Sequence, residues 1–165
     1  MLGAEHEMNM IAFTARGLAS VGATLGASML GGLCNLSATF NGGAPGQVEA
    51  LWDELTAQRD LGAAVAARLD RGESLPGFNH LAYPAGDPRA LMLLKTAGAI
   101  QRLPPIAAQV ERLTGWKPAI DFGFVALRRA LGAPRDAAQT LQMAGRCVGI
   151  IARARYVGPS LAPKH

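Results

Sequence analysis

The stretch GFNHLAYPAGDPRA, residues 77–90, carries the clearest combination of side chains that could do chemistry. His80 stands early in it, and Arg89 follows nine residues later, behind the turn formers Pro84 and Gly86. Proline fixes φ and glycine permits positive φ, so the stretch predicts a shaped loop and not the interior of a helix. A loop that presents an imidazole and a guanidinium suits a small anionic ligand.

Three further polar side chains stand in otherwise apolar segments: His6 in EHEMN, Asp121 at the start of an apolar stretch, and Arg146 as the only charge in LQMAGRCVGII. Each has an ordinary explanation: a partly exposed helical histidine, a helix N-cap, or the partner of an internal carboxylate. Taken together with His80 and Arg89, these residues have the types needed for one site. Arginines bind planar carboxylates in bidentate fashion, a histidine can polarise a carbonyl, and an aspartate can abstract a proton. The set therefore predicts carbon–carbon chemistry on a small dicarboxylate.

The elements that must position these residues are predicted to be helices. Half of the 165 residues are hydrophobic but only 5% are aromatic, so the core is built mainly from alanine, leucine and other aliphatic residues. Alanine and leucine favour helices, and no strand-like alternation occurs, so we expect an all-α fold. Helical patterns cover residues 5–36 with a break near Gly31 and Gly32, and then 47–69, 90–103, 106–113, 122–131 and 135–152.

Charge and cysteine content narrow the class of protein. The net charge is +4 and the basic residues are dispersed, which argues against nucleic-acid binding and suits small anions.

Residues 17–48 carry no charge and are long enough to span a bilayer. Their Gly, Ala, Ser and Thr content favours a buried helix instead, so no membrane association is expected. Cys34 and Cys147 have no metal-binding spacing, and with acidic residues near the N-terminus they predict a cytoplasmic protein without a metal.

Five segments in order resemble the C-terminal part of the citrate synthase family, over almost the whole chain. AEHEMNMIAFTARGLASVGATLGASMLGGLCNL resembles the family's histidine-bearing stretch and its Gly/Ala-rich helices, and ATFNGGAP resembles its Gly-Pro-Leu-His-Gly-Gly-Ala segment. LPGFNHLAYPAGDPRA, PAIDFGFVALRRALGAP and MAGRCVGIIA resemble its Pro-Gly-Phe-Gly-His loop, its Asn-Val-Asp helix entry and its Gly-Arg-Thr-Val-Gly helix. The resemblance implies a citrate synthase-like fold with a large-domain remnant, residues 1–41 and 122–165, and a small domain, residues 42–121.

The resemblance also implies a role for each matching position. Asp121 is the expected base that takes a proton from acetyl-CoA, and His80 donates to the oxaloacetate carbonyl. The expected dicarboxylate-binding residues are His6, Arg89 and Arg146. The backbone expected to contact CoA is that of Leu75, Pro76, Gly77, Phe78 and Asn79. No permanently bound cofactor is implied, because the CoA thioester is itself a substrate.

Several positions depart from the family pattern. Asn41 stands where the family has a second catalytic histidine, and an amide can donate a hydrogen bond but cannot shuttle a proton. Asn79 replaces a glycine in the CoA loop; asparagine tolerates the left-handed conformation. Near the C-terminus the family has an Arg-Pro-Arg segment that reaches the neighbouring subunit, and here only Arg153 and Arg155 are candidates to substitute.

Two functions follow from this pattern. The first is a citrate synthase-like acyltransferase that condenses acetyl-CoA, or a related acyl-CoA, with oxaloacetate at impaired activity. The second is a non-catalytic citrate synthase-like binding protein, a fragment or a subunit of a split enzyme. The apolar helices near the N-terminus predict a homodimer or a companion chain that covers them. Cleavage of citryl-CoA uses similar residues and is not separated from condensation by these motifs.

Overall fold

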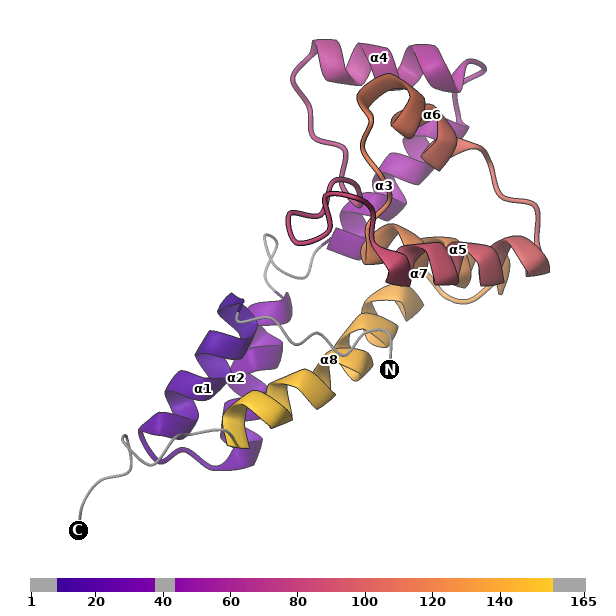
Figure 1. Ribbon diagram of the computed structural model, residues 1–165. Coiled ribbons are helices and arrows are strands. Elements are labelled where there is room, and N and C mark those ends of the chain that lie inside the picture. The colour runs from indigo at the N-terminus through magenta and orange to yellow at the C-terminus, as the bar shows by residue number, and fades with distance from the viewer. Residues whose placement is uncertain (1–8, 38–43, 156–165) are drawn as a thin grey trace. The chain divides into compact units, whose positions relative to one another are not determined.

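The computed structural model describes residues 9–37 and 44–155, and these residues form helices and their connections (Figure 1). The helices are α1 Met10–Ser20, α2 Leu25–Ser37, α3 Ala44–Thr56, α4 Leu61–Asp70, α5 Pro88–Ile100, α6 Ile106–Thr114, α7 Ile120–Ala130 and α8 Ala137–Arg155. Within the described ranges no strand occurs, only an isolated β-bridge between Phe78 and Pro118. The all-α prediction is confirmed.

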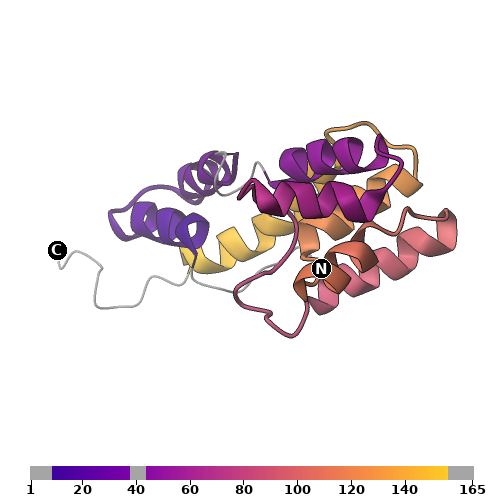
Figure 2. The ribbon, with the colours of Figure 1, turned by 90° about the horizontal axis from the view of Figure 1, so that it is seen from above.

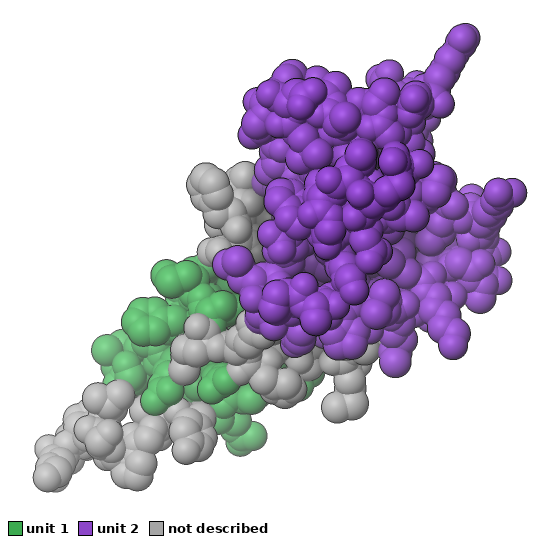
Figure 3. All heavy atoms as spheres, turned by 45° about the horizontal axis from the view of Figure 1, so that its top comes forward, with its two compact units in different colours: residues 1–43, 140–165 green, residues 44–139 purple. Residues whose placement is uncertain are grey.

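Contacts between Cα atoms divide the chain into two compact units, residues 1–43 with 140–165 and residues 44–139 (Figure 3). The expected division placed residues 122–139 with the large domain. In the structure α7 packs on α5 and α3, which groups those residues with the unit of residues 44–139. The expected boundary after residue 41 lies outside the described residues. Correspondence with a large and a small domain stays a prediction.

In the unit that includes both ends of the chain, α1 and α2 lie side by side (Figure 2). Their core contains Ile11, Ala15, Leu36, Ile150 and Ala154, the last two from α8. The Asn35 amide on α2 also donates to Thr14 Oγ1 on α1 over 3.0 Å. This unit is therefore held by aliphatic packing and an interhelical hydrogen bond.

The break between the first two helices lies elsewhere than the sequence predicted. The chain turns at residues 21–24, where Gly22 has φ +86° and Ala23 N donates to Leu18 O. Gly31 and Gly32 lie inside α2 instead. A Cβ on Gly32 would stand 3.1 Å from Ile150 Cγ2, so the glycine permits close helix packing and does not end the helix.

Part of the apolar surface of this unit is exposed. Phe13 is 61% exposed and Leu30 is 64% exposed, and Met10, Val21 and Leu25 are exposed as well. The sequence predicted that this chain has too few apolar helices to cover these two, and among the described residues these side chains are exposed. None of the helices in the described ranges combines the length and the apolar composition that crossing a bilayer requires.

The unit of residues 44–139 is built around α7, which packs on α5 and α3, while α4 pairs with α6. Trp52 of α3 stacks on Phe122 of α7 with ring centroids 5.1 Å apart, and Phe78 contacts the same ring at 4.8 Å. Phe122 is buried, as are the next four residues of α7. The N-terminal half of α7 is thus fixed by an aromatic cluster.

The crossing of α5 and α7 depends on a glycine. A Cβ built on Gly123 would lie 3.0 Å from Leu93 Cβ and 3.2 Å from Ala90 Cα, closer than ordinary contact. Backbone and branched side chains close to a Cβ cannot easily move away. Gly123 therefore sets how closely the two helices approach.

We predict that Gly123→Ala lowers the free energy of unfolding by about 1–3 kcal/mol, because the added methyl overpacks the α5–α7 crossing. Urea unfolding at pH 7, followed by far-UV circular dichroism, measures the change. Gly98→Ala on α5 is the matched control, since nothing lies within 4 Å of its added Cβ. There alanine should stabilise by about 0.5–1 kcal/mol. Equal effects at both positions would contradict the packing role of Gly123.

Candidate active site

One buried carboxylate, that of Asp87, joins the loop that contains His80 to two helices. Its Oδ1 accepts from Arg89 N at 3.0 Å and from Arg89 Nε at 2.9 Å. Its Oδ2 accepts from Arg89 Nη2 at 2.9 Å and from Ile120 N at 3.1 Å. Asp87 is therefore both the N-cap of α5 and the acceptor for the first backbone N–H of α7.

The protonation state of Asp87 follows from these partners. Burial by itself acts to raise the pKa of the carboxyl, but the Arg89 guanidinium and the backbone N–H groups outweigh it and hold the pKa of Asp87 below its ordinary value. Hydrogen bonds and positive charge favour the ionised form of an acid. The carboxylate is thus charged near neutral pH, and it holds Arg89 in place.

The segment before His80 is tied to the start of α7. Asn79 N donates to Lys117 O at 3.0 Å, and Ala119 N donates to Gly77 O at 2.7 Å. Gly77 has φ +84°, and a Cβ there would stand 2.6 Å from Val48 Cγ2. Asn79 has φ +58°, the left-handed conformation that asparagine tolerates. The loop is therefore held against the segment that leads to Asp121.

His80, Tyr83 and Arg89 form a cluster within this loop. Ala82 N donates to His80 Nδ1 at 3.2 Å, and the rings of His80 and Tyr83 have centroids 5.2 Å apart. Arg89 Cζ lies 4.7 Å from the centroid of the Tyr83 ring, a cation–π contact. Because Nδ1 accepts a hydrogen bond, we assign the proton of the neutral imidazole to Nε2, which is then a donor.

Asp121 lies in the first turn of α7 and is not its N-cap. Ala119 occupies the N-cap position, and Asp87 accepts the N–H of Ile120. The N-cap explanation of Asp121 is therefore wrong, because a residue distant in sequence supplies the acceptor. Asp121 is partly buried.

The pKa of Asp121 reports its surroundings. Burial raises the pKa of this carboxyl above its ordinary value, while the charges of His80 and Arg89 oppose the rise and the charge of Asp87 adds to it. The carboxyl thus lies within electrostatic range of both His80 and Arg89. The unit of residues 44–139 brings together three of the predicted site residues: His80, Arg89 and Asp121.

The other predicted residues fall into three groups. His6 and Asn41 lie outside the described residues. In the segment proposed to contact CoA, Leu75 and Phe78 are buried, whereas Pro76, Gly77 and Asn79 are at least partly exposed. Arg146 lies on α8 in the other compact unit, is 3% exposed, and has its pKa lowered by burial to about 10. Among the described residues, no group of three or more His, Cys, Asp or Glu side chains could hold a metal.

Sequence reasoning assigned no role to Tyr83 or Asp87. The Asp-Pro pair at 87–88 is a typical start of a helix, which could have identified Asp87 as the N-cap of α5. Its bond to Ile120 spans 33 residues and has no local signal. Tyr83 carries no signal either, because its contacts depend on how the loop turns.

Known proteins that are similar to this chain have citrate synthase in their names. The family profile described as "Citrate synthase, C-terminal domain" matches residues 1–157. A Mycobacterium tuberculosis relative named "Putative citrate synthase 2" is 45% identical over 94 residues, covering 57% of this chain and 25% of that protein. The "Citrate/2-methylcitrate synthase" of Bacillus subtilis is 28% identical, covering 99% of this chain and 51% of that protein.

Solved structures share the fold. The citrate synthase of Thermoplasma acidophilum, in a ternary complex with carboxymethyl coenzyme A and oxaloacetate, has a TM-score of 0.79 at 21% identity, covering 97% of this chain and 47% of that one. Identity at this level shows the fold alone. The chain spans about half or less of the length of the curated relatives named above.

We predict that Asp87→Asn lowers the free energy of unfolding at pH 7 by about 3 kcal/mol, because it breaks a buried ion pair. The folded-state pKa of Asp87 is lowered, so its stabilisation is complete above the ordinary aspartate pKa, about 4, and is lost as pH falls through the lowered value. The difference between wild type and variant should therefore shrink below about pH 4. Urea midpoints measured from pH 7 downward test this.

Asp60→Asn is the control for this experiment. Asp60 caps α4 through Ala63 N at 3.0 Å and is exposed. Asparagine caps helices as well as aspartate does, so this change should cost only a few tenths of a kcal/mol. If Asp87→Asn behaves like Asp60→Asn, or if its effect is the same at every pH, the charge of Asp87 does not hold the site together.

Proposed function

The chain belongs to the citrate synthase family, as its motifs predicted, and we propose that it carries the C-terminal part of a site that condenses acetyl-CoA, or a related acyl-CoA, with oxaloacetate. The observation that carries the proposal is the placement of Asp121, whose pKa is raised by burial, within electrostatic range of His80 and Arg89. A base, a hydrogen-bond donor and a cation in one place are what such a condensation needs.

In the proposed reaction Asp121 is the general base. Its carboxylate takes a proton from the carbon next to the thioester carbonyl, and the electron pair left on that carbon attacks the keto carbon of oxaloacetate. A carbon acid is weak, so a base with a raised pKa receives the proton more readily than an ordinary aspartate. The rate should fall as pH drops through the pKa of Asp121, because the protonated carboxyl cannot accept the proton.

The keto oxygen of oxaloacetate becomes an alkoxide as the new bond forms. We assign His80 as the donor to this oxygen, since its Nδ1 already accepts from Ala82 N and its proton is then on Nε2. Arg89 binds one carboxylate of the substrate, in an orientation set by Asp87 and Tyr83. By resemblance to the family, His6 and Arg146 bind the same dicarboxylate.

The acyl-CoA is assigned to the segment Leu75 to Asn79. Its backbone is fixed by the bonds from Asn79 N and to Gly77 O, next to the start of α7. In this assignment the segment contacts the adenine end of CoA, and a backbone that is fixed before binding lowers the loop entropy that binding costs. The name of the Bacillus relative joins citrate and 2-methylcitrate, so the acyl group of this proposal is acetyl or a close relative.

Asn41 favours a second candidate function, a binding protein without catalysis. The family's histidine at this position hydrogen-bonds the thioester oxygen as the enolate forms. An asparagine amide can donate that bond, but it cannot exchange the proton during turnover. In this alternative the chain, alone or as a subunit of a split enzyme, binds the two substrates and does not join them.

The proposed reaction is tested by thiol release from acetyl-CoA in the presence of oxaloacetate, with calorimetric titration of both ligands. Asp121→Asn should abolish thiol release while oxaloacetate still binds, because an amide cannot act as the base. Asn41→His should raise the rate at least about tenfold, the lower part of what a positioned acid–base group supplies.

Leu113→Ala on α6 is the control, since this exposed side chain lies outside the proposed site. Binding of both ligands with no thiol release, in the parent and in Asn41→His, supports the binding protein. Failure of the folded chain to bind either ligand contradicts both functions.

We also propose that the exposed apolar residues of α1 and α2 are covered by a second copy of this chain or by a companion polypeptide. The set comprises Met10 and Phe13 of α1, Leu25 and Leu30 of α2, and Val21 in the turn between them. Large apolar patches on soluble proteins mark interaction surfaces, and burying apolar area contributes about 25 cal/mol per Å².

Sedimentation velocity of the purified chain over a range of concentrations tests this proposal. We expect a dimer or larger species, and Phe13→Glu should shift it toward monomer by placing a charge in the interface. Leu91→Glu on α5 is the control, because Leu91 is exposed to a similar extent outside this set. A compact monomer at every concentration, in parent and variants alike, would refute self-association.

A further inference from the structure

A cavity lies near the C-terminal end of α7, away from Asp121. It has a volume of about 290 Å³ and is lined by Trp52, Gln101, Arg102, Leu103, Pro104, Arg128, Arg129 and Ala130. Asp121 and Arg128 are seven residues apart on one helix, which is about 10 Å along its axis. None of the described lining residues is acidic. The cavity belongs wholly to the unit of residues 44–139.

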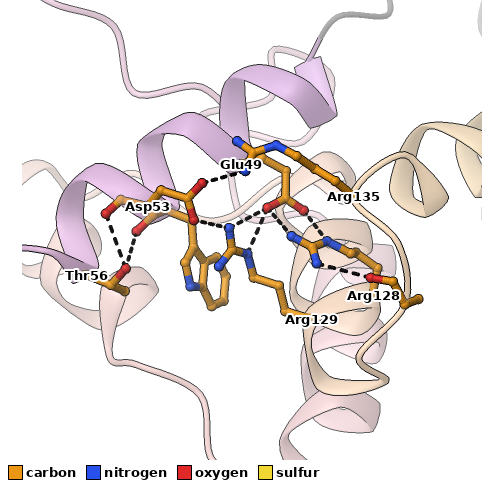
Figure 4. Close-up of polar contacts among 8 residues, drawn as sticks. Glu49, Asp53, Thr56, Arg128, Arg129 and Arg135 are labelled. Carbon is orange, nitrogen blue, oxygen red and sulfur yellow. Dashed lines mark hydrogen bonds and ion pairs between the residues drawn. The ribbon is translucent and has the colours of Figure 1, made fainter.

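Two acids of α3, the buried Glu49 and the exposed Asp53, form ion pairs with two arginines of the cavity. Glu49 of α3 is 1% exposed and forms ion pairs with both Arg128 and Arg129 (Figure 4). Asp53, one turn further along α3, pairs with Arg129 and with Arg135, the latter at 2.7 Å. These carboxylates hold the guanidinium groups of the helix end in one arrangement. Such pre-ordering lowers the entropy that ligand binding costs.

The cationic groups outnumber the acids here. Four arginines, at positions 102, 128, 129 and 135, stand against the two carboxylates of Glu49 and Asp53, which leaves a charge of +2. Arg102 is exposed at the cavity and forms no ion pair with any described residue. A guanidinium carries five N–H donors, so Arg102 can bind an anion with two parallel hydrogen bonds.

The aromatic residue of the cavity does not offer a stacking platform. The ring of Trp52 is stacked on Phe122 at 5.1 Å, and Arg129 Cζ lies over it at 5.3 Å. Its contacts are therefore already made within the protein. The volume is at the lower end of ligand pockets, which span about 300–1,000 Å³. Size and charge both favour a compact ligand over a nucleotide base.

We propose that this cavity binds a compact dianion, in the form of a phosphate group or of the paired carboxylates of a small dicarboxylate. Arg102 and Arg129 are the residues that contact it, with Arg128 contributing charge. The site is distinct from the proposed catalytic site and does not depend on the proposed condensation, because its residues are at the opposite end of α7 and serve no step of that reaction.

Fluorescence of Trp52 reports on this cavity in the full-length chain. Trp116→Phe leaves Trp52 as the only tryptophan, since the sequence has two. Titration with sodium phosphate at pH 8, and separately with succinate, is carried out at constant ionic strength with chloride as the balancing anion. We expect a saturable change with one or both anions and none with chloride.

Arg102→Ala should weaken that binding at least about tenfold, the loss expected for hydrogen bonds to a charged group. Arg59→Ala is the matched control: it removes the same charge from another exposed arginine that has no ion pair within the described residues. Saturable binding that is weakened by Arg102→Ala and not by Arg59→Ala supports the site. The anion that binds shows whether the ligand of this cavity carries a phosphate group or two carboxylates.

Three outcomes overturn the proposal: no saturable change with either anion, an equal loss in Arg59→Ala, or binding that persists in Arg102→Ala. Arg102 is exposed and follows the end of α5, so its removal should leave the fold intact, as far-UV circular dichroism checks. As a second readout, whichever of the two anions gives the saturable change should raise the urea midpoint of the parent relative to chloride, and should not raise that of Arg102→Glu.

Discussion

The buried carboxylate of Asp87 is the interaction on which the candidate site depends. A charge removed from water is tolerated only when its hydrogen-bonding capacity is satisfied, and Asp87 meets this condition through Arg89 and the backbone of Ile120. The same bonds that stabilise the carboxylate fix the start of α5, the start of α7 and the direction of the Arg89 side chain. The requirements of one buried charge thus determine where the predicted base and cation stand.

Helix α7 connects this interaction to the rest of its unit. Its first turn carries Asp121, its buried middle packs through Phe122 and Gly123, and its last turn carries Arg128 and Arg129. Acidic residues near a helix N-terminus and basic residues near its C-terminus complement the helix dipole, so the charge order of α7 agrees with its direction. The aromatic and glycine contacts in the middle keep both ends in place, which lets one helix serve two separate polar regions.

The unit of residues 1–43 and 140–165 is stabilised by the packing of small and aliphatic residues. Small residues allow close approach of its helices, as Gly32 does beside Ile150, and the core they form is aliphatic. Small residues also leave limited surface to bury, and larger apolar side chains such as Phe13 and Leu30 remain exposed. Exposed apolar residues of this kind are typical of interaction surfaces, which is the basis for the proposal that α1 and α2 are covered by a second chain.

The positions of several helices, the loop before Arg89 and the family were predictable from short stretches of the sequence. Helix patterns predicted residues 106–113 and 122–131, and the structure has helices at Ile106–Thr114 and Ile120–Ala130. The turn formers before Arg89 predicted the loop, and the order of five motifs predicted the family. These features depend on backbone preferences and on neighbours within a few residues, which any stretch of sequence carries with it.

Features that depend on distant residues were decided only by the tertiary structure. Gly31 and Gly32 resembled a helix break, but they lie within α2, where Leu18 and Ile150 occupy the space that a side chain would need. Asp121 resembled an N-cap, but Asp87, 33 residues before Ile120, supplies that acceptor. Glu49 and Arg128 are 79 residues apart and meet only because α3 packs on α7. Side-chain partners across such separations are selected by packing and burial, which a local pattern does not encode.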